Sequence, residues 1–150
     1  MHWAITGMTA AELIKARVDA AKPHMGLKTW KNGPSGKISK ADVTTAKNYL
    51  DEAEIKSLER VVSMYLDYAE NQAARQIPMK MVDWIQRLDA FLTFNEYEIL
   101  QDAGKVSHAV AKALAEQAYE TFRVTQDRAF ESDFEKEAKR VTAKKKGKPE

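Results

Sequence analysis

Residues 51–74, DEAEIKSLERVVSMYLDYAENQAA, carry the apolar pattern that decides the fold. Asp51 with Glu54 is a helix-start signal, because both carboxylates can accept hydrogen bonds from free backbone N–H groups. One apolar stripe follows at helical spacing: Ile55, Leu58, Val62, Tyr65, Leu66, Ala69 and Ala73. Val61, Met64 and Tyr68 widen the apolar arc past half of the circumference. The pattern therefore predicts a central helix over about 52–75 with neighbours on two sides.

The same start signal recurs at Thr9 with Glu12, at Ser39 with Asp42 and at Ser132 with Glu135. Apolar spacing predicts further helices over about 10–21, 40–50 and 79–95, and another from about His108. Pro23 with Gly26 ends the first of these helices, and Pro78 ends the central helix. Two alternatives remain for the last helix, which either continues to about Val141 or restarts at Ser132.

No stretch alternates long enough to predict a strand, and no internal repeat is visible. The fold class predicted is all-α: a single-domain bundle of about five to six helices over residues 1–141. A long irregular basic loop interrupts it at about 22–38. The lysine-rich end, residues 142–150, is expected to be a disordered basic tail.

The composition excludes several kinds of protein and site. There are no cysteines, so neither disulfides nor thiolate zinc sites can form. The three histidines lack metal-ligand spacing, and no phosphate-binding glycine motif is present, so we expect no metal and no cofactor. No apolar run approaches the about 20 residues needed to span a bilayer. We therefore expect a cytoplasmic protein without membrane contact.

The net charge of +2 conceals a strong partition along the chain. Residues 1–47 hold eight basic against three acidic groups, and residues 48–138 hold ten against eighteen. Residues 139–150 hold six basic groups and one acid. An acidic body thus lies between two basic ends, and basic clusters are typical of polyanion binding.

The loop and the helices beside it supply the candidate site residues. Met25, Leu27, Trp30 and Ile38 can pin the loop to the bundle, and we expect Trp30 to be largely buried. Arg17 falls inside the apolar stripe of its helix, where it must snorkel, find an internal carboxylate or bind an anion. In the segment 40–50, Lys40 and Lys47 flank a buried stripe and have no structural explanation.

Five ordered motifs, HWAITGMTAAELI, MGLKTWK, KADVTTAKNYL, MYLDYAE and NEYEILQDAGKVSH, resemble the C-terminal part of the bacterial RhuM-type virulence-associated proteins. Such proteins are commonly longer, are found with mobile islands, and have an N-terminal portion that resembles a DNA-binding module and is missing here. The resemblance assigns no activity. Its motif residues include Arg17, Gly26, Leu27, Trp30, Lys31, Lys40, Asp42, Lys47, Asn48 and Tyr49.

Three functional hypotheses follow. In the first, a non-catalytic binding or regulatory domain assists a DNA-binding partner domain: Lys28, Lys31, Lys40 and Lys47 meet phosphates of DNA or RNA, and Trp30 or Tyr49 stacks or packs. In the second, a metal-independent enzyme acts on nucleic acid or a nucleotide: Arg17, Lys31 or Lys47 stabilises charge, and Tyr49 or Asp42 moves protons. In the third, the domain binds other proteins or forms a homodimer through its acidic helices. The candidate residues are Arg17, Lys28, Trp30, Lys31, Lys40, Asp42, Lys47, Asn48 and Tyr49.

Overall fold

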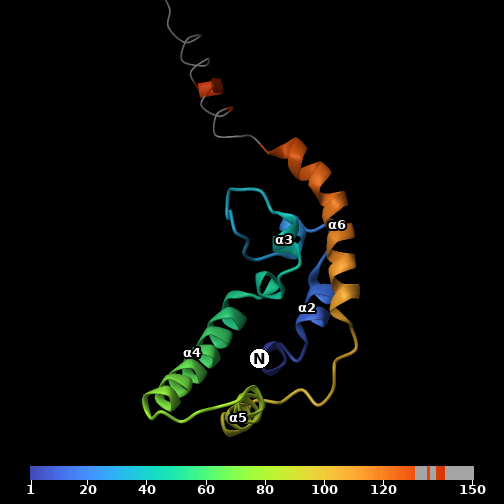
Figure 1. Ribbon diagram of the computed structural model, residues 1–150. Coiled ribbons are helices and arrows are strands. Elements are labelled where there is room, and N and C mark those ends of the chain that lie inside the picture. Colours follow the sequence, from blue (N-terminus) through green and yellow to red (C-terminus); the bar gives the residue numbers. More distant parts are fainter. Residues whose placement is uncertain (131–134, 136–137, 141–150) are drawn as a thin grey trace, which may run out of the picture.

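The computed structural model describes residues 1–130, 135 and 138–140 (Figure 1). Residues 1–130 form six α-helices and two short 3-10 helices, residues 135 and 138–140 are also helical, and none of the described residues lies in a strand. In chain order the elements are α1 (His2–Thr6), α2 (Ala10–Arg17), η1 (Pro23–Gly26), α3 (Lys40–Val43), η2 (Ala46–Tyr49), α4 (Glu52–Ala74), α5 (Met81–Phe94) and α6 (His108–Ala129). The prediction of an all-α single domain is confirmed.

The hydrophobic core lies where α2, the loop, η2 and α6 meet. Leu13 and Ile14 of α2 are almost fully buried, and Ala111 and Ala115 of α6 have no exposed surface. The alanines allow the two helices to approach closely, so the larger α2 side chains fill the space between them. Figure 1 shows α2 lying along α6, with the loop and α3 beside them. The long loop is therefore built into the core.

The helix predicted over 52–75 forms as α4, and it has two helical neighbours, α1 and α5. Its prediction as the central helix is wrong, because the core lies elsewhere and Val61 and Gln72 are the only buried residues of α4. Figure 1 shows α4 leading away from the pair formed by α2 and α6, with α5 near its far end. Tyr65 of α4 donates a hydrogen bond to the Trp84 carbonyl of α5 at 2.8 Å. We call α4 and α5 together the arm.

The predicted helix over 40–50 is broken into α3 and η2. The hydroxyls of Thr44 and Thr45 both donate to the carbonyl of Ala41, at 3.1 and 3.0 Å. Side-chain hydroxyls of this kind offer the backbone an alternative to the helical ladder. Asn48 likewise donates through Nδ2 to the carbonyl of Asp42 at 2.9 Å. These local bonds stop the helix after Val43 and redirect the chain.

Other helix ends also differ from the predictions. α2 stops at Arg17, where Val18 turns extended, instead of reaching residue 21. α6 stops at Ala129, with Phe130 extended, so the unbroken helix to Val141 is wrong. Residues 135 and 138–140 are helical again, whereas Ser132, the predicted restart, and the tail at 142–150 lie outside the described residues. α1 was not predicted, although Gly7, with φ 67°, is a typical left-handed stop for it.

Candidate functional site

The loop at 22–38 follows a fixed path. Met25, Leu27 and Ile38 are buried beneath it. Trp30 is half-buried, and its Nε1 donates to the Gly36 carbonyl at 2.8 Å. The side chain of Gln126 in α6 makes two hydrogen bonds to the main chain of Ile38. Its Oε1 accepts from the N–H of Ile38 at 2.8 Å, and its Nε2 donates to the Ile38 carbonyl at 3.1 Å. The loop is thus anchored from beneath and from α6.

Arg17 lies in an internal ion pair. Its Nη1 and Nη2 each donate to a carboxylate oxygen of Glu54 at 2.5 Å, and Nη1 also donates to the Tyr49 carbonyl at 2.8 Å. The hydrogen bonds from Arg17 hold the pKa of Glu54 below its ordinary value, and those same bonds raise the pKa of Arg17. Arg17 therefore joins α2 to η2 and to the start of α4.

Asp42 and Asn48 fasten the loop through its main chain. Asp42 Oδ1 accepts from the N–H of Lys31 at 3.0 Å, and Oδ2 accepts from the N–H of Ser39 at 2.8 Å. Burial acts to raise the pKa of Asp42, but the hydrogen bonds from Ser39 and Lys31 outweigh it and lower that pKa. The Asn48 carbonyl accepts from the N–H of Lys28 at 2.7 Å. We call Arg17, Glu54, Asp42, Asn48 and Tyr49 the loop latch.

Tyr49 belongs to the core. Its side chain has no exposed surface, and its hydroxyl donates to the Val43 carbonyl at 2.8 Å. Burial raises the pKa of the phenol well above its ordinary value. The structure therefore leaves Tyr49 neither a surface for stacking nor an open path for moving a proton.

The four candidate lysines divide into two groups. Lys40 pairs with Glu116 at 3.4 Å and with Glu120 at 3.8 Å, both on α6. Within the described part of the chain, no carboxylate lies within 4.0 Å of Lys28, Lys31 or Lys47. All three are exposed. We call Lys28, Lys31 and Lys47 the lysine trio.

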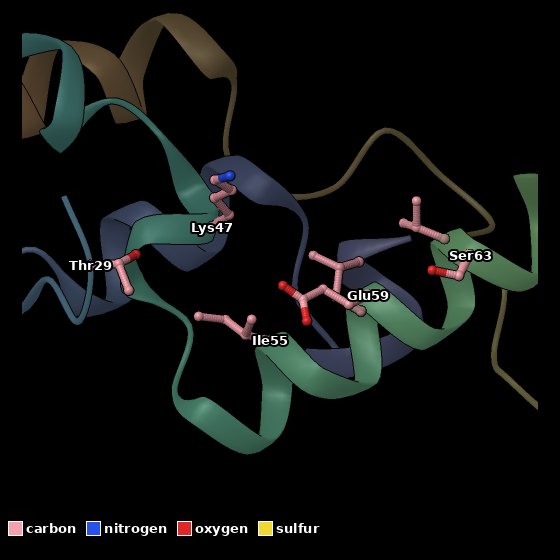
Figure 2. A pocket seen from close by; sticks show the side chains of 7 residues that line it. Thr29, Lys47, Ile55, Glu59 and Ser63 are labelled. Carbon is pink, nitrogen blue, oxygen red and sulfur yellow. The ribbon is translucent and has the colours of Figure 1, made fainter. Parts of the chain in front are cut away.

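Lys47 stands at the mouth of a pocket of about 430 Å³ between the loop, η2 and α4. Figure 2 shows Thr29 and Lys47 on one side, with Ile55, Glu59 and Ser63 of α4 on the other. Ile55, Leu58 and Val62 give this pocket an apolar lining. Lys47 is the single predicted site residue that lines it, so the pocket does not gather the candidates into one site.

A second hollow, of about 290 Å³, lies between the loop and α6. Its lining includes His24 and Trp30 from the loop with Phe122 and Phe130 from the far end of α6. His24 meets Trp30 edge to face, with ring centroids 4.6 Å apart. We call it the aromatic hollow, and Trp30 is the predicted site residue in it.

The arm exposes large apolar side chains. The exposed fractions are 61% for Leu66, 74% for Met81, 58% for Ile85 and 86% for Phe94. Leu66 belongs to the apolar stripe that predicts the helix over 52–75, and Met81 and Ile85 belong to the apolar face that predicts the helix over 79–95. Because α4 and α5 leave the core, part of each stripe has no partner within the described residues.

Among the residues that the structure describes, no group of three or more His, Asp or Glu side chains is placed to hold a metal ion. No described helix is both long and apolar enough to cross a bilayer.

Several important contacts escaped the sequence reasoning. Glu54 was assigned as a helix cap, which it is, but its partnership with Arg17 spans 37 residues. Gln126 holds Ile38 across 88 residues. Apolar spacing carries no signal for such pairs. The phenylalanines of the aromatic hollow were not singled out as site residues from the sequence.

The fold and the site define an all-α domain in which a latched basic loop packs on a core formed with α2 and α6. The chain belongs to the Virulence protein RhuM family, whose family model matches residues 1–131. The resemblance found in the sequence is thereby confirmed. No curated protein and no solved structure matches the chain.

Proposed function

We propose that this domain is a non-catalytic binding module that holds DNA or RNA by its phosphates, with the lysine trio as the contact. One observation carries the proposal: among the described residues, no carboxylate lies within 4.0 Å of the exposed Lys28, Lys31 and Lys47, whereas Arg17, Lys37 and Lys40 are each paired. An unpaired lysine can replace the counterions of a phosphate without first giving up a carboxylate.

The latch supports the proposal by placing the trio. The main-chain N–H groups of Lys28 and Lys31 are held by Asn48 and Asp42, and Lys47 directly precedes Asn48 in the chain. Residues 22–38 contain four lysines and no carboxylate. Little backbone freedom is lost when such a fixed loop meets a polyanion, so the loss of entropy on binding is small.

The non-catalytic part of the proposal rests on the same contacts. The second hypothesis assigned charge stabilisation to Arg17, Lys31 or Lys47 and proton transfer to Tyr49 or Asp42. Its two candidates for proton transfer are buried and make internal hydrogen bonds, and Arg17 is bonded to Glu54 and to the Tyr49 carbonyl. The module would assist the DNA-binding portion that the resemblance implies for longer relatives.

The test uses fluorescence anisotropy at low ionic strength to measure how tightly the protein binds a short labelled single strand of nucleic acid and its duplex. The variant Lys28→Gln/Lys31→Gln/Lys47→Gln should lose most of the affinity. The matched control, Lys15→Gln/Lys56→Gln/Lys105→Gln, removes the same charge from exposed positions outside the trio. Equal losses in the two variants would show that net charge alone drives binding, and they would contradict the proposal.

The exposed arm favours a second candidate function, pairing of two copies of the domain. Met81 and Ile85 are more than half exposed, and large exposed apolar patches mark interaction surfaces. Light scattering of the full chain should then give a dimer mass, and Met81→Asp/Ile85→Asp should give the monomer. A wild-type chain that stays monomeric at high concentration rules this candidate out.

A further inference from the structure

The aromatic hollow combines four aromatic side chains with one lysine, Lys37. It is lined by His24, Trp30, Pro34, Ser35, Gly36, Lys37, Ile38, Phe122, Thr125, Gln126, Ala129 and Phe130. Its volume of about 290 Å³ lies at the lower limit for ligand pockets, roughly 300 Å³. The hollow is therefore sized for one planar ring system and is too small for a drug-sized ligand.

The lining of the hollow carries aromatic rings that are held in place. Trp30 is held by its hydrogen bond to Gly36 and meets His24 edge to face. Phe122 of α6 packs against the core, which restrains its position. Aromatic walls of this kind stack nucleobases of any sequence, because every base has a π-face.

The charges around the hollow suit a phosphate backbone. Lys37 pairs with Asp127 at 2.8 Å and lies over the Phe130 ring, 4.8 Å from its centroid. Lys31 directly follows Trp30, and no carboxylate of the described residues lies within 4.0 Å of it, although its charge helps to lower the pKa of Asp42. A base against Trp30 would thus have an exposed ammonium on the next residue of the chain for its phosphate.

We infer that the aromatic hollow accepts one unstacked base of a single-stranded nucleic acid while the lysine trio holds the strand's phosphates. This inference rests on the proposed function and makes it specific for single strands. In a duplex each base is stacked and paired, and extracting one costs a few kcal/mol. A duplex would therefore meet the lysines alone.

The experiment compares two variants with the same substitution on α6, using the full chain. Thr125→Leu places a larger apolar side chain in the hollow, whereas Thr121→Leu changes an exposed residue outside its lining. Thr125→Leu should weaken binding of a short single strand about fivefold or more, the effect of one lost base–aromatic stack. Thr121→Leu should leave single-strand binding unchanged, and neither variant should alter duplex binding.

A second readout follows Trp30 directly. In a chain with Trp3→Phe and Trp84→Phe, saturating single strand should change the Trp30 emission, and saturating duplex should not. If both nucleic acids bind equally and Thr125→Leu has no effect, the inference fails while the proposed function stands. If neither binds, the proposed function fails and the inference fails with it.

Discussion

Arg17 and Glu54 form a two-point ion pair that ties the end of α2 to the first turn of α4, with both N–O distances at 2.5 Å. The pair explains why a guanidinium lies inside an apolar stripe. It also separates the predicted site residues by role. The loop latch positions the chain, and the lysine trio remains available for a partner.

The first prediction concerns the ion pair itself. Arg17→Gln should lower the free energy of unfolding by about 2 kcal/mol, because the pair is charged, hydrogen-bonded and mostly shielded from water. Lys56→Gln, which breaks the exposed pair with Glu52, should cost at most about 0.5 kcal/mol. Urea unfolding measures both. If Arg17 instead bound a ligand, its variant would unfold like wild type and lose affinity for nucleic acid.

The second prediction is a loss of stability in acid. The pKa values of Glu54 and Asp42 lie below their ordinary values of 4.5 and 3.8, so the unfolded chain takes up these protons first as the pH falls. The contribution of these two carboxylates to the free energy of unfolding is present above pH 4.5, and it disappears as the pH falls through their lowered pKa values. Glu54→Gln should flatten this pH dependence in urea unfolding, and Glu70→Gln, at an exposed position, serves as its control.

The third prediction concerns two glycines with positive φ. At Gly26, with φ +82°, an added Cβ would meet the Arg17 carbonyl oxygen at 2.3 Å, whereas at Gly7, with φ +67°, it would meet open space. Gly26→Ala should therefore lower the melting temperature more than Gly7→Ala, since only the former adds a clash to the backbone strain. Equal decreases of the melting temperature in the two variants would contradict this prediction, because they would show that the backbone at Arg17 moves away from the added methyl group at little cost.

The fourth prediction tests the latch at the loop. Asp42 holds the N–H of Lys31, the residue after Trp30, so Asp42→Asn should loosen the loop and expose the indole. In a chain with Trp30 as its single tryptophan, acrylamide should quench the emission weakly, and Asp42→Asn should increase the quenching. Quenching as strong as in the unfolded chain, before any Asp42 substitution, would contradict the half-buried Trp30.

Local signals in the sequence predicted much of this fold. The capping pairs Thr9–Glu12, Ser39–Asp42 and Asp51–Glu54 all form, because each needs only residues three positions apart. The spacing of the apolar residues predicted that these segments are helices and gave their order along the chain. The break after Val43 was missed because apolar spacing does not show that the hydroxyls of Thr44 and Thr45 compete with the backbone N–H groups for the carbonyl of Ala41.

The remaining features depend on contacts that no local pattern encodes. An apolar stripe indicates that a helix buries a face but does not identify its partner, so α4 was assigned to the centre of a core that it leaves. Arg17 was correctly singled out as needing a partner, and Glu54 was identified only by the fold. The aromatic hollow joins residues almost 100 positions apart, from His24 to Phe122.

The salt dependence of nucleic-acid binding tests the central claim most directly. Log affinity falls linearly with log salt concentration, and each phosphate contact contributes about 0.7 to 0.9 to the slope. Replacing Lys28, Lys31 and Lys47 with glutamine in the full chain should therefore lower the slope by about 2 to 3. The control at Lys15, Lys56 and Lys105 should keep the wild-type slope. A trio variant whose slope equals that of wild type would show that these lysines do not meet phosphates, and it would contradict the account.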